Sequence, residues 1–179
     1  MVRILKKSIG ILGGSFDPAH LGHLKISQIA LKKIKLSRIL WIITKQNPFK
    51  DRAFYSLTQR ITKAKKLIKN YNRVQVIHLE KTVRSTRSIN AVNYLINKRK
   101  YKNIYFIIWS DNLIKFHKWK SWKKIVKLTK LIVFSRAGYD RKGKKSIVAK
   151  YLKNKIIFIN NKPITVSSTQ LRKKAKKNR

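Results

Sequence analysis

Two histidines and a glycine pair lie close together near the start of the chain, at a spacing that suits phosphate chemistry. Residues 9–12 are apolar, Gly13 and Gly14 follow, and an amphipathic stretch comes next. This order predicts a strand, a glycine-rich turn that can come close to a ligand, and a helix starting near His20. The first N–H groups of a helix bind phosphate, and side chains three residues apart project from one side of it. The imidazoles of His20 and His23 are therefore predicted to donate hydrogen bonds to the phosphates of a nucleotide.

Two other interpretations of these residues stay open from their types alone. A glycine pair can simply join two elements, and a histidine pair can ligate a metal ion. A metal site takes three or four ligands, yet the chain has no cysteine and only 5 Asp and Glu residues. The sequence therefore predicts no metal held directly by protein ligands.

Segment 13–23, Gly-Gly-Ser-Phe-Asp-Pro-Ala-His-Leu-Gly-His, resembles the first signature of the nucleotidyltransferase superfamily. In that signature an aromatic residue, a proline and a His-x-Gly-His set follow a strand. The resemblance implies that His20 and His23 are catalytic and stabilise the charge that builds on the α-phosphate of ATP. It also implies that these two histidines bind ATP together with Gly13, Gly14, Ser15 and Phe16.

Segment 166–172, Val-Ser-Ser-Thr-Gln-Leu-Arg, puts hydroxyl groups at the start of a predicted helix and an arginine in its first turn. Such hydroxyls are also ordinary helix N-caps, so the segment alone leaves both interpretations open. It resembles the second signature of the same superfamily, in which the helix start and the arginine hold the β- and γ-phosphates. The resemblance implies ATP binding by Ser168, Thr169 and Arg172. A catalytic role for Arg172 is implied too, since a forked guanidinium can pair with the oxygens of leaving pyrophosphate.

The middle of the chain resembles the nicotinate-nucleotide adenylyltransferases of that superfamily. Segment 47–50, Asn-Pro-Phe-Lys, resembles their substrate loop, and segment 106–122 resembles their strand-to-loop segment. The resemblance implies that Lys50, Thr86, Asp111 and Trp119 bind nicotinate mononucleotide. Lys50 would also be catalytic by neutralising phosphate, and Thr86 would bind the carboxylate. Asp111 would bind ribose hydroxyls, and Trp119 would stack on the nicotinate ring. The chain departs from the family pattern at Arg87, Asn90, Trp109 and Ser110.

The resemblance implies an enzyme that moves AMP from ATP to nicotinate mononucleotide, giving deamido-NAD and pyrophosphate. Mg²⁺ would accompany ATP as a co-substrate, bound through phosphates and water rather than through a protein cage. Two alternatives stay open. One is a related nucleotidyltransferase whose acceptor is nicotinamide mononucleotide or phosphopantetheine. The other is a polyanion- or nucleic-acid-binding protein on an inactive nucleotide fold.

Alternating strands and helices must position these residues. Apolar runs predict strands at 9–12, 38–44, 74–79, 104–109, 131–135 and 156–159, and helices are predicted at 21–34, 57–69, 88–98 and the basic C-terminus. This alternation predicts an α/β, Rossmann-like, doubly wound parallel sheet of five or six strands, which the resemblance makes of nucleotidyltransferase type. Its ligand would bind beyond the carboxyl ends of the strands. We expect residues 1–179 to form a single nucleotidyltransferase domain, with Thr58 capping a helix and 138–145 as a surface loop.

The chain carries 46 Lys and Arg residues, and its net charge is +41. Lysine is spread over nearly every segment, so the charge predicts nonspecific adhesion to polyanions rather than a dedicated nucleic-acid groove. Acids retained in so basic a chain suggest specific tasks. We assign Asp17, Asp51 and Asp111 to loops of the site, and place Glu80 and Asp140 elsewhere. No apolar run approaches the ~20 residues of a membrane span, and we expect a soluble, cytoplasmic protein with no membrane partner.

Overall fold

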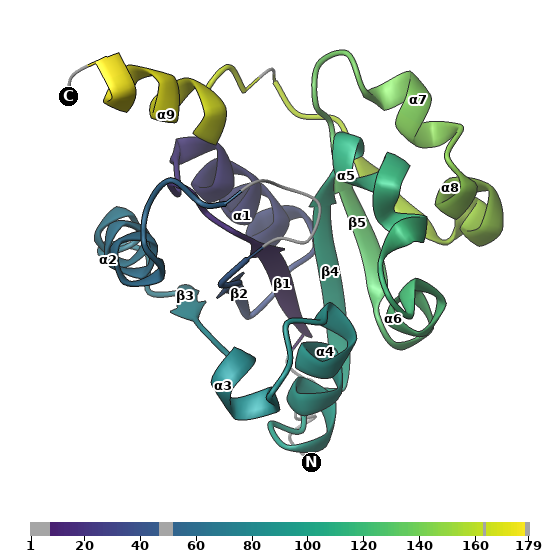
Figure 1. The fold of residues 1–179 in the computed structure, drawn as a ribbon. Helices are drawn as coiled ribbons and strands as arrows, with labels where there is room; N and C mark the ends of the chain where they lie inside the picture. The colour runs from purple at the N-terminus through teal and green to yellow at the C-terminus, as the bar shows by residue number, and fades with distance from the viewer. Residues whose placement is uncertain (1–7, 47–51, 163, 178–179) are drawn as a thin grey trace.

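Six parallel strands form one sheet in the order β3-β2-β1-β4-β5-β6 in the computed structural model, which describes residues 8–46, 52–162 and 164–177 (Figure 1). The strands are β1 (Ser8–Gly14), β2 (Arg38–Ile43), β3 (Val74–Ile77), β4 (Asn103–Trp109), β5 (Lys130–Phe134) and β6 (Ile156–Ile159). The prediction of a doubly wound parallel sheet is confirmed, with six strands rather than five.

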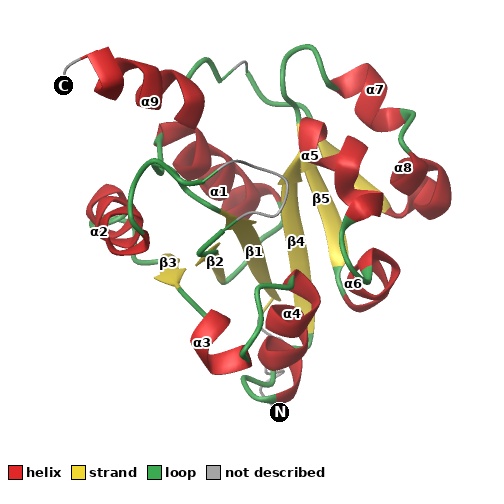
Figure 2. Cartoon of the chain, viewed as in Figure 1, coloured by secondary structure: helices red, strands yellow, loops and turns green. Residues whose placement is uncertain are grey.

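Helices cover both faces of the sheet (Figure 2). The longer helices are α1 (Leu21–Lys33), α2 (Leu57–Leu67), α4 (Ser88–Asn97) and α9 (Ser168–Lys177). The shorter ones are α3 (Glu80–Val83), α5 (Ser110–Lys115), η1 (Phe116–Lys118), α6 (Trp122–Leu128), α7 (Asp140–Lys144), α8 (Ile147–Leu152) and η2 (Lys153–Lys155). Segment 138–145, expected to be a loop, therefore contains α7. The cap of α2 is Ser56 rather than Thr58, because the Ser56 hydroxyl accepts the backbone N–H of Gln59.

Side chains of the strands alternate between two apolar cores, one on each face, because successive residues of a strand point to opposite sides. On β4, Ile104, Phe106 and Ile108 pack in the core that includes α4, α6 and α8. Ile107 and Trp109 of the same strand pack in the other core, with α1 and α2. Burial on both faces explains why these strands read as continuous apolar runs.

The site lies where the strand order reverses. The chain moves outward from β1 to β2 and β3, then returns to place β4 on the other side of β1. Connections above the carboxyl ends of β1 and β4 therefore diverge and leave a crevice between them. The segment that follows β1 leads to His20, and the segment that follows β4 begins at Ser110. The first signature and the strand-to-loop segment 106–122 thus border one crevice.

Candidate active site

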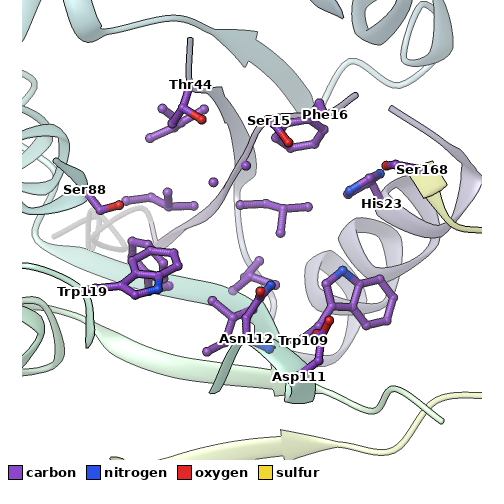
Figure 3. Close-up of a pocket in the computed structure, with 18 of the residues that line it drawn as sticks. Ser15, Phe16, His23, Thr44, Ser88, Trp109, Asp111, Asn112, Trp119 and Ser168 are labelled. Atoms are coloured by element: carbon purple, nitrogen blue, oxygen red, sulfur yellow. Dashed lines mark hydrogen bonds between the residues drawn. The ribbon is translucent and has the colours of Figure 1, made fainter. Parts of the chain in front are cut away.

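A cavity of about 880 Å³ occupies this crevice and is lined by segments distant in sequence (Figure 3). Its lining includes most of the predicted site: Gly13, Gly14, Ser15, Phe16, His20, His23, Thr86, Asp111, Trp119, Ser168 and Thr169. In Figure 3, His23 and Ser168 lie together at one end, and Trp119 and Ser88 lie at the other. The histidine pair and Trp119 therefore line opposite ends of one cavity.

The two histidines are held by backbone hydrogen bonds at the start of α1. His20 is the N-cap residue, and its Nδ1 accepts the backbone N–H of Gly22 at 3.1 Å. His23 reaches back, and its Nδ1 accepts the backbone N–H of His20 at 3.3 Å. Because Nδ1 accepts in both rings, the proton of each neutral imidazole sits on Nε2. Each ring is thus oriented to donate a hydrogen bond through Nε2.

Burial, and to a smaller extent the positive charge of Arg136, together lower the pKa of His20 to about 4. The ring is therefore uncharged at neutral pH. The His20 and His23 rings lie 3.9 Å apart between centroids. Two imidazolium ions at that distance would repel each other, so the neutral state of His20 also allows the pair to sit close together.

Aromatic packing fixes the position of the His23 ring. Phe16 lies 4.7 Å from the His23 ring and stacks on Trp41 at 5.1 Å, between ring centroids. The Trp41 indole N–H donates to the Ser27 hydroxyl at 2.9 Å, and that hydroxyl donates to the His23 backbone carbonyl at 2.8 Å. Ser27 and Trp41 are fully buried. The aromatic residue of the first signature therefore packs against His23 within the cavity wall.

The glycines of the first signature do not form the tight turn that the sequence predicted. Gly13 and Gly14 end strand β1, and it is Phe16 that has a left-handed backbone, with φ of 47°. A Cβ on Gly13 would meet nothing within 4 Å, so the cavity approaches the backbone there. A Cβ on Gly22 would lie 2.8 Å from the His20 ring. Close approach of a ligand is thus possible at Gly13, and Gly22 leaves room for His20.

Helix α9 closes the cavity near the first signature, as its position beside the start of α1 shows (Figure 1). The Ser168 hydroxyl donates to the Pro18 carbonyl at 2.9 Å. Arg172 donates to the Asp17 carbonyl at 2.7 Å, and its guanidinium lies 3.8 Å from the Asp17 carboxylate. These contacts bring the two signatures together across 150 residues. Arg172 itself is bonded to Asp17 and does not belong to the described cavity lining.

Of the predicted acceptor residues, Trp119 lies at the other end of the cavity (Figure 3). Trp119 packs against Phe116 with ring centroids 4.9 Å apart and meets Phe106 edge-on at 6.1 Å, leaving it in the cavity wall. Thr86 is exposed in the lining just before α4. Lys50 and Asp51 lie outside the described residues.

A cation that the sequence did not single out, Arg136, lines the cavity after β5. Its Nη1 donates to the Asp111 carboxylate at 3.0 Å, and its guanidinium lies 5.9 Å from the Trp109 ring centroid. The Trp109 indole, unusual for the family pattern, thus forms part of the wall against which Arg136 packs. Only the position of Arg136 just beyond a strand could have signalled it, and that signal is lost among 46 basic residues.

Glu80 and Asp140, which the sequence analysis placed away from the site, also contact it. Glu80 lines the cavity and accepts the backbone N–H of Lys45 at 2.9 Å. Asp140 accepts the backbone N–H of Arg136 at 3.0 Å and so holds the segment that carries this cation. The expectation that these acids lie away from the site was therefore wrong, because β3 and β5 end at the same edge of the sheet as β1.

Comparison with known proteins identifies the family. The cytidylyltransferase-like family model matches residues 11–174. A Pelagibacter ubique protein named "Probable nicotinate-nucleotide adenylyltransferase" is 51% identical over 94% of this chain and 93% of its own. A Nitratiruptor protein of the same name is 36% identical over 94% of this chain and 89% of its own. The chain belongs to the nicotinate-nucleotide adenylyltransferase family.

A solved structure shares the fold. Plasmodium falciparum nicotinic acid mononucleotide adenylyltransferase, complexed with NaAD, superposes with a TM-score of 0.75. It is 21% identical and covers 93% of this chain and 83% of its own. The fold is thus the Rossmann-like nucleotidyltransferase fold. Within the ranges that the structure describes, no helix has the length and apolar character needed to cross a membrane.

Proposed function

We propose that this chain transfers AMP from ATP to nicotinate mononucleotide, releasing pyrophosphate and forming the deamido dinucleotide. The observation that carries the proposal is the single cavity that joins the histidine pair and the start of α9 to the loop of Trp119. The name of the relative that is 51% identical supports the same activity. A 5′-phosphate oxygen of the acceptor attacks the α-phosphorus; the new P–O bond forms as the bond to pyrophosphate breaks, with no covalent enzyme intermediate.

The chain contributes positioning and charge stabilisation to this transfer. His20 and His23 donate Nε2–H hydrogen bonds to oxygens of the α-phosphate and the bridging position, where negative charge builds up. Ser168 and Thr169 at the start of α9 receive the outer phosphates. Arg172 exchanges its bond with the Asp17 carbonyl for the leaving pyrophosphate, and Lys50 offsets charge on the phosphates.

The acceptor occupies the other end of the cavity. Trp119 offers the face of its indole to the flat nicotinate ring, and Thr86 offers a hydroxyl to the carboxylate. Asp111 accepts hydrogen bonds from ribose hydroxyls. Arg136, bonded to Asp111 and directed along the same wall, supplies positive charge where the two substrates' phosphates meet.

Mg²⁺ fits this site as a partner of the triphosphate. The carboxylates that border the cavity already have protein partners: Asp111 has Arg136, and one oxygen of Glu80 has the Lys45 N–H. Within the described residues no cluster of three metal-binding side chains is formed. Magnesium bound to ATP phosphates would neutralise part of their charge.

The test measures pyrophosphate release from ATP with nicotinate mononucleotide and nicotinamide mononucleotide in competition. We expect the acid to be used in preference, and a His23→Ala variant to lose at least about 100-fold in kcat. His78→Ala is the matched control, since His78 bonds to the Ile43 carbonyl and does not line the cavity in the described structure. Preference for nicotinamide mononucleotide, or for phosphopantetheine, would contradict the proposal that nicotinate mononucleotide is the acceptor. Binding of random DNA without any turnover of ATP would contradict the enzyme.

A further inference from the structure

One arginine beneath the cavity is buried almost completely. Arg60, on the first turn of α2, is 1% exposed. Within the described part of the chain its guanidinium donates only to backbone carbonyl oxygens: Nη1 to Ser15 at 2.6 Å and Thr44 at 2.7 Å, Nη2 to Lys45 at 2.7 Å, and Nε to Tyr55 at 3.1 Å. Four of the five N–H donors of the side chain are thus used.

This charge is buried at considerable cost. Among the described residues no carboxylate lies within 4.0 Å of Arg60 to form an ion pair. Burial lowers the pKa of Arg60, and the more distant charges of Asp17 and Glu80 act in the opposite direction. A buried cation without a paired anion is unfavourable unless its hydrogen bonds are well satisfied. The four carbonyl bonds meet that need, and they fix four pieces of backbone around one rigid planar group.

Two of the four carbonyls belong to the wall of the active site. Ser15 follows β1 and Thr44 follows β2, and both residues line the cavity, whereas Arg60 does not. Their carbonyl oxygens therefore point to the buried guanidinium and away from the space assigned to the phosphates. A carbonyl oxygen turned toward that space would repel phosphate oxygens.

A second set of hydrogen bonds joins the turn after β1 to the segment before α2. The Asp17 carboxylate accepts the backbone N–H groups of Phe54 at 2.8 Å and Tyr55 at 2.9 Å. Tyr55 in turn gives its carbonyl to Arg60. Arg60 of α2 therefore binds the segment before His20, and Asp17 of that segment binds the segment before α2.

We propose that Arg60 is a positioning residue for adenylyl transfer, which rests on the proposed function. It fixes the 15–17 backbone relative to β2 and so sets where His20 and His23 meet the α-phosphate. Because Arg60 touches no substrate, its loss affects the geometry of the reacting groups more than the binding of ATP. A misplacement of about 1 Å can cost roughly 100-fold in rate.

The experiment compares Arg60→Met and Arg60→Lys with the wild type in pyrophosphate release, with kcat expressed per folded molecule. Arg73, an exposed residue, offers a control, because it too donates to backbone carbonyls, those of Leu36 and Ser37 in the connection before β2. We expect Arg60→Met to lower kcat at least about 30-fold with KM for ATP changed by less than about threefold. Lysine should recover part of kcat, since an ammonium can still donate to several carbonyls.

Each outcome of this experiment either supports or overturns the positioning role of Arg60. A kcat for Arg60→Met within about twofold of the wild type, or a loss no larger than that of Arg73→Met, overturns the proposal. A rise in KM with unchanged kcat overturns it as well, because it would indicate uniform binding. If Arg60→Met does not fold, Arg60→Lys against Arg73→Lys provides the same comparison. A wild-type enzyme inactive with both substrates would instead refute the proposed function.

Discussion

Replacing Gly22 by alanine tests whether the placement of His20 governs catalysis. The new Cβ would lie 2.8 Å from both Cε1 and Nδ1 of His20, and 2.9 Å from Cγ2 of Ile164. Non-bonded carbon atoms rest at about 3.5 Å or more, so the ring must move by about 0.7 Å. Ile164 crowds the other side of the added methyl group, which prevents helix α1 from absorbing the whole shift.

Both activity and stability are expected to fall. A shift of this order in a donor to the α-phosphate should lower kcat by about 10- to 100-fold. Loss of the hydrogen bond from the Gly22 N–H to His20 removes a helix cap worth about 1 kcal/mol. Alanine restores about 1 kcal/mol over glycine inside a helix. These two terms nearly cancel, but crowding of the methyl group against His20 and Ile164 should lower the free energy of unfolding by about 1–3 kcal/mol.

Two other glycines provide controls for the assay, which combines pyrophosphate-release kinetics with urea unfolding. Gly13→Ala adds a methyl group to open space at the cavity wall; it should raise KM for ATP and leave stability unchanged. Gly10→Ala puts a Cβ 2.8 Å from Ile107 in the core, and should cost about 1–3 kcal/mol of stability with normal kcat per folded molecule. A Gly22→Ala enzyme with wild-type kcat would refute the proposed placement of His20.

Three further predictions concern protonation, the Asp17 contacts and charge. His20 stays neutral in the folded chain down to a pKa of about 4, whereas the unfolded ring protonates near its ordinary 6.5; folding stability should therefore fall as pH drops through 6.5 toward 4. Urea unfolding should show a loss of about 1 kcal/mol from about pH 7 to about pH 5, allowing for the ring's partial exposure, and His20→Gln should lack this increment. Asp17→Asn leaves the N–H of Phe54 or Tyr55 facing an amide donor. It should cost about 1–3 kcal/mol in urea unfolding, and a change below about 0.5 kcal/mol would contradict the role of these bonds. The net charge of +41 should cause binding to random DNA that weakens at least about tenfold between about 50 and about 200 mM salt in fluorescence anisotropy; equal affinities at both concentrations would count against it.

Local pattern predicted the strands well, because burial on both faces leaves a continuous apolar run in each one. It also predicted the first residues of α1, α2 and α4 correctly, but not the cap of α2. Thr58 and Ser56 are both suitable caps, and only the backbone geometry selects Ser56. Segment 138–145 is polar with two glycines, yet it forms α7, whose Gly143 packs beside Ser110 of α5, a contact that no local pattern contains.

The sequence by itself determined the candidate chemistry of this protein. The Gly13–His23 segment and the 166–172 segment resemble the two family signatures in residue type and spacing, which are local properties of the chain. Only the tertiary structure decided what surrounds those segments: the guanidinium of Arg60 under the turn, Arg136 on Asp111, and Arg172 on Asp17. In a chain with 46 basic residues, charge cannot distinguish these arginines from the rest. Burial and the convergence of parallel strand ends at one edge distinguish them, and both exist only after the chain has folded.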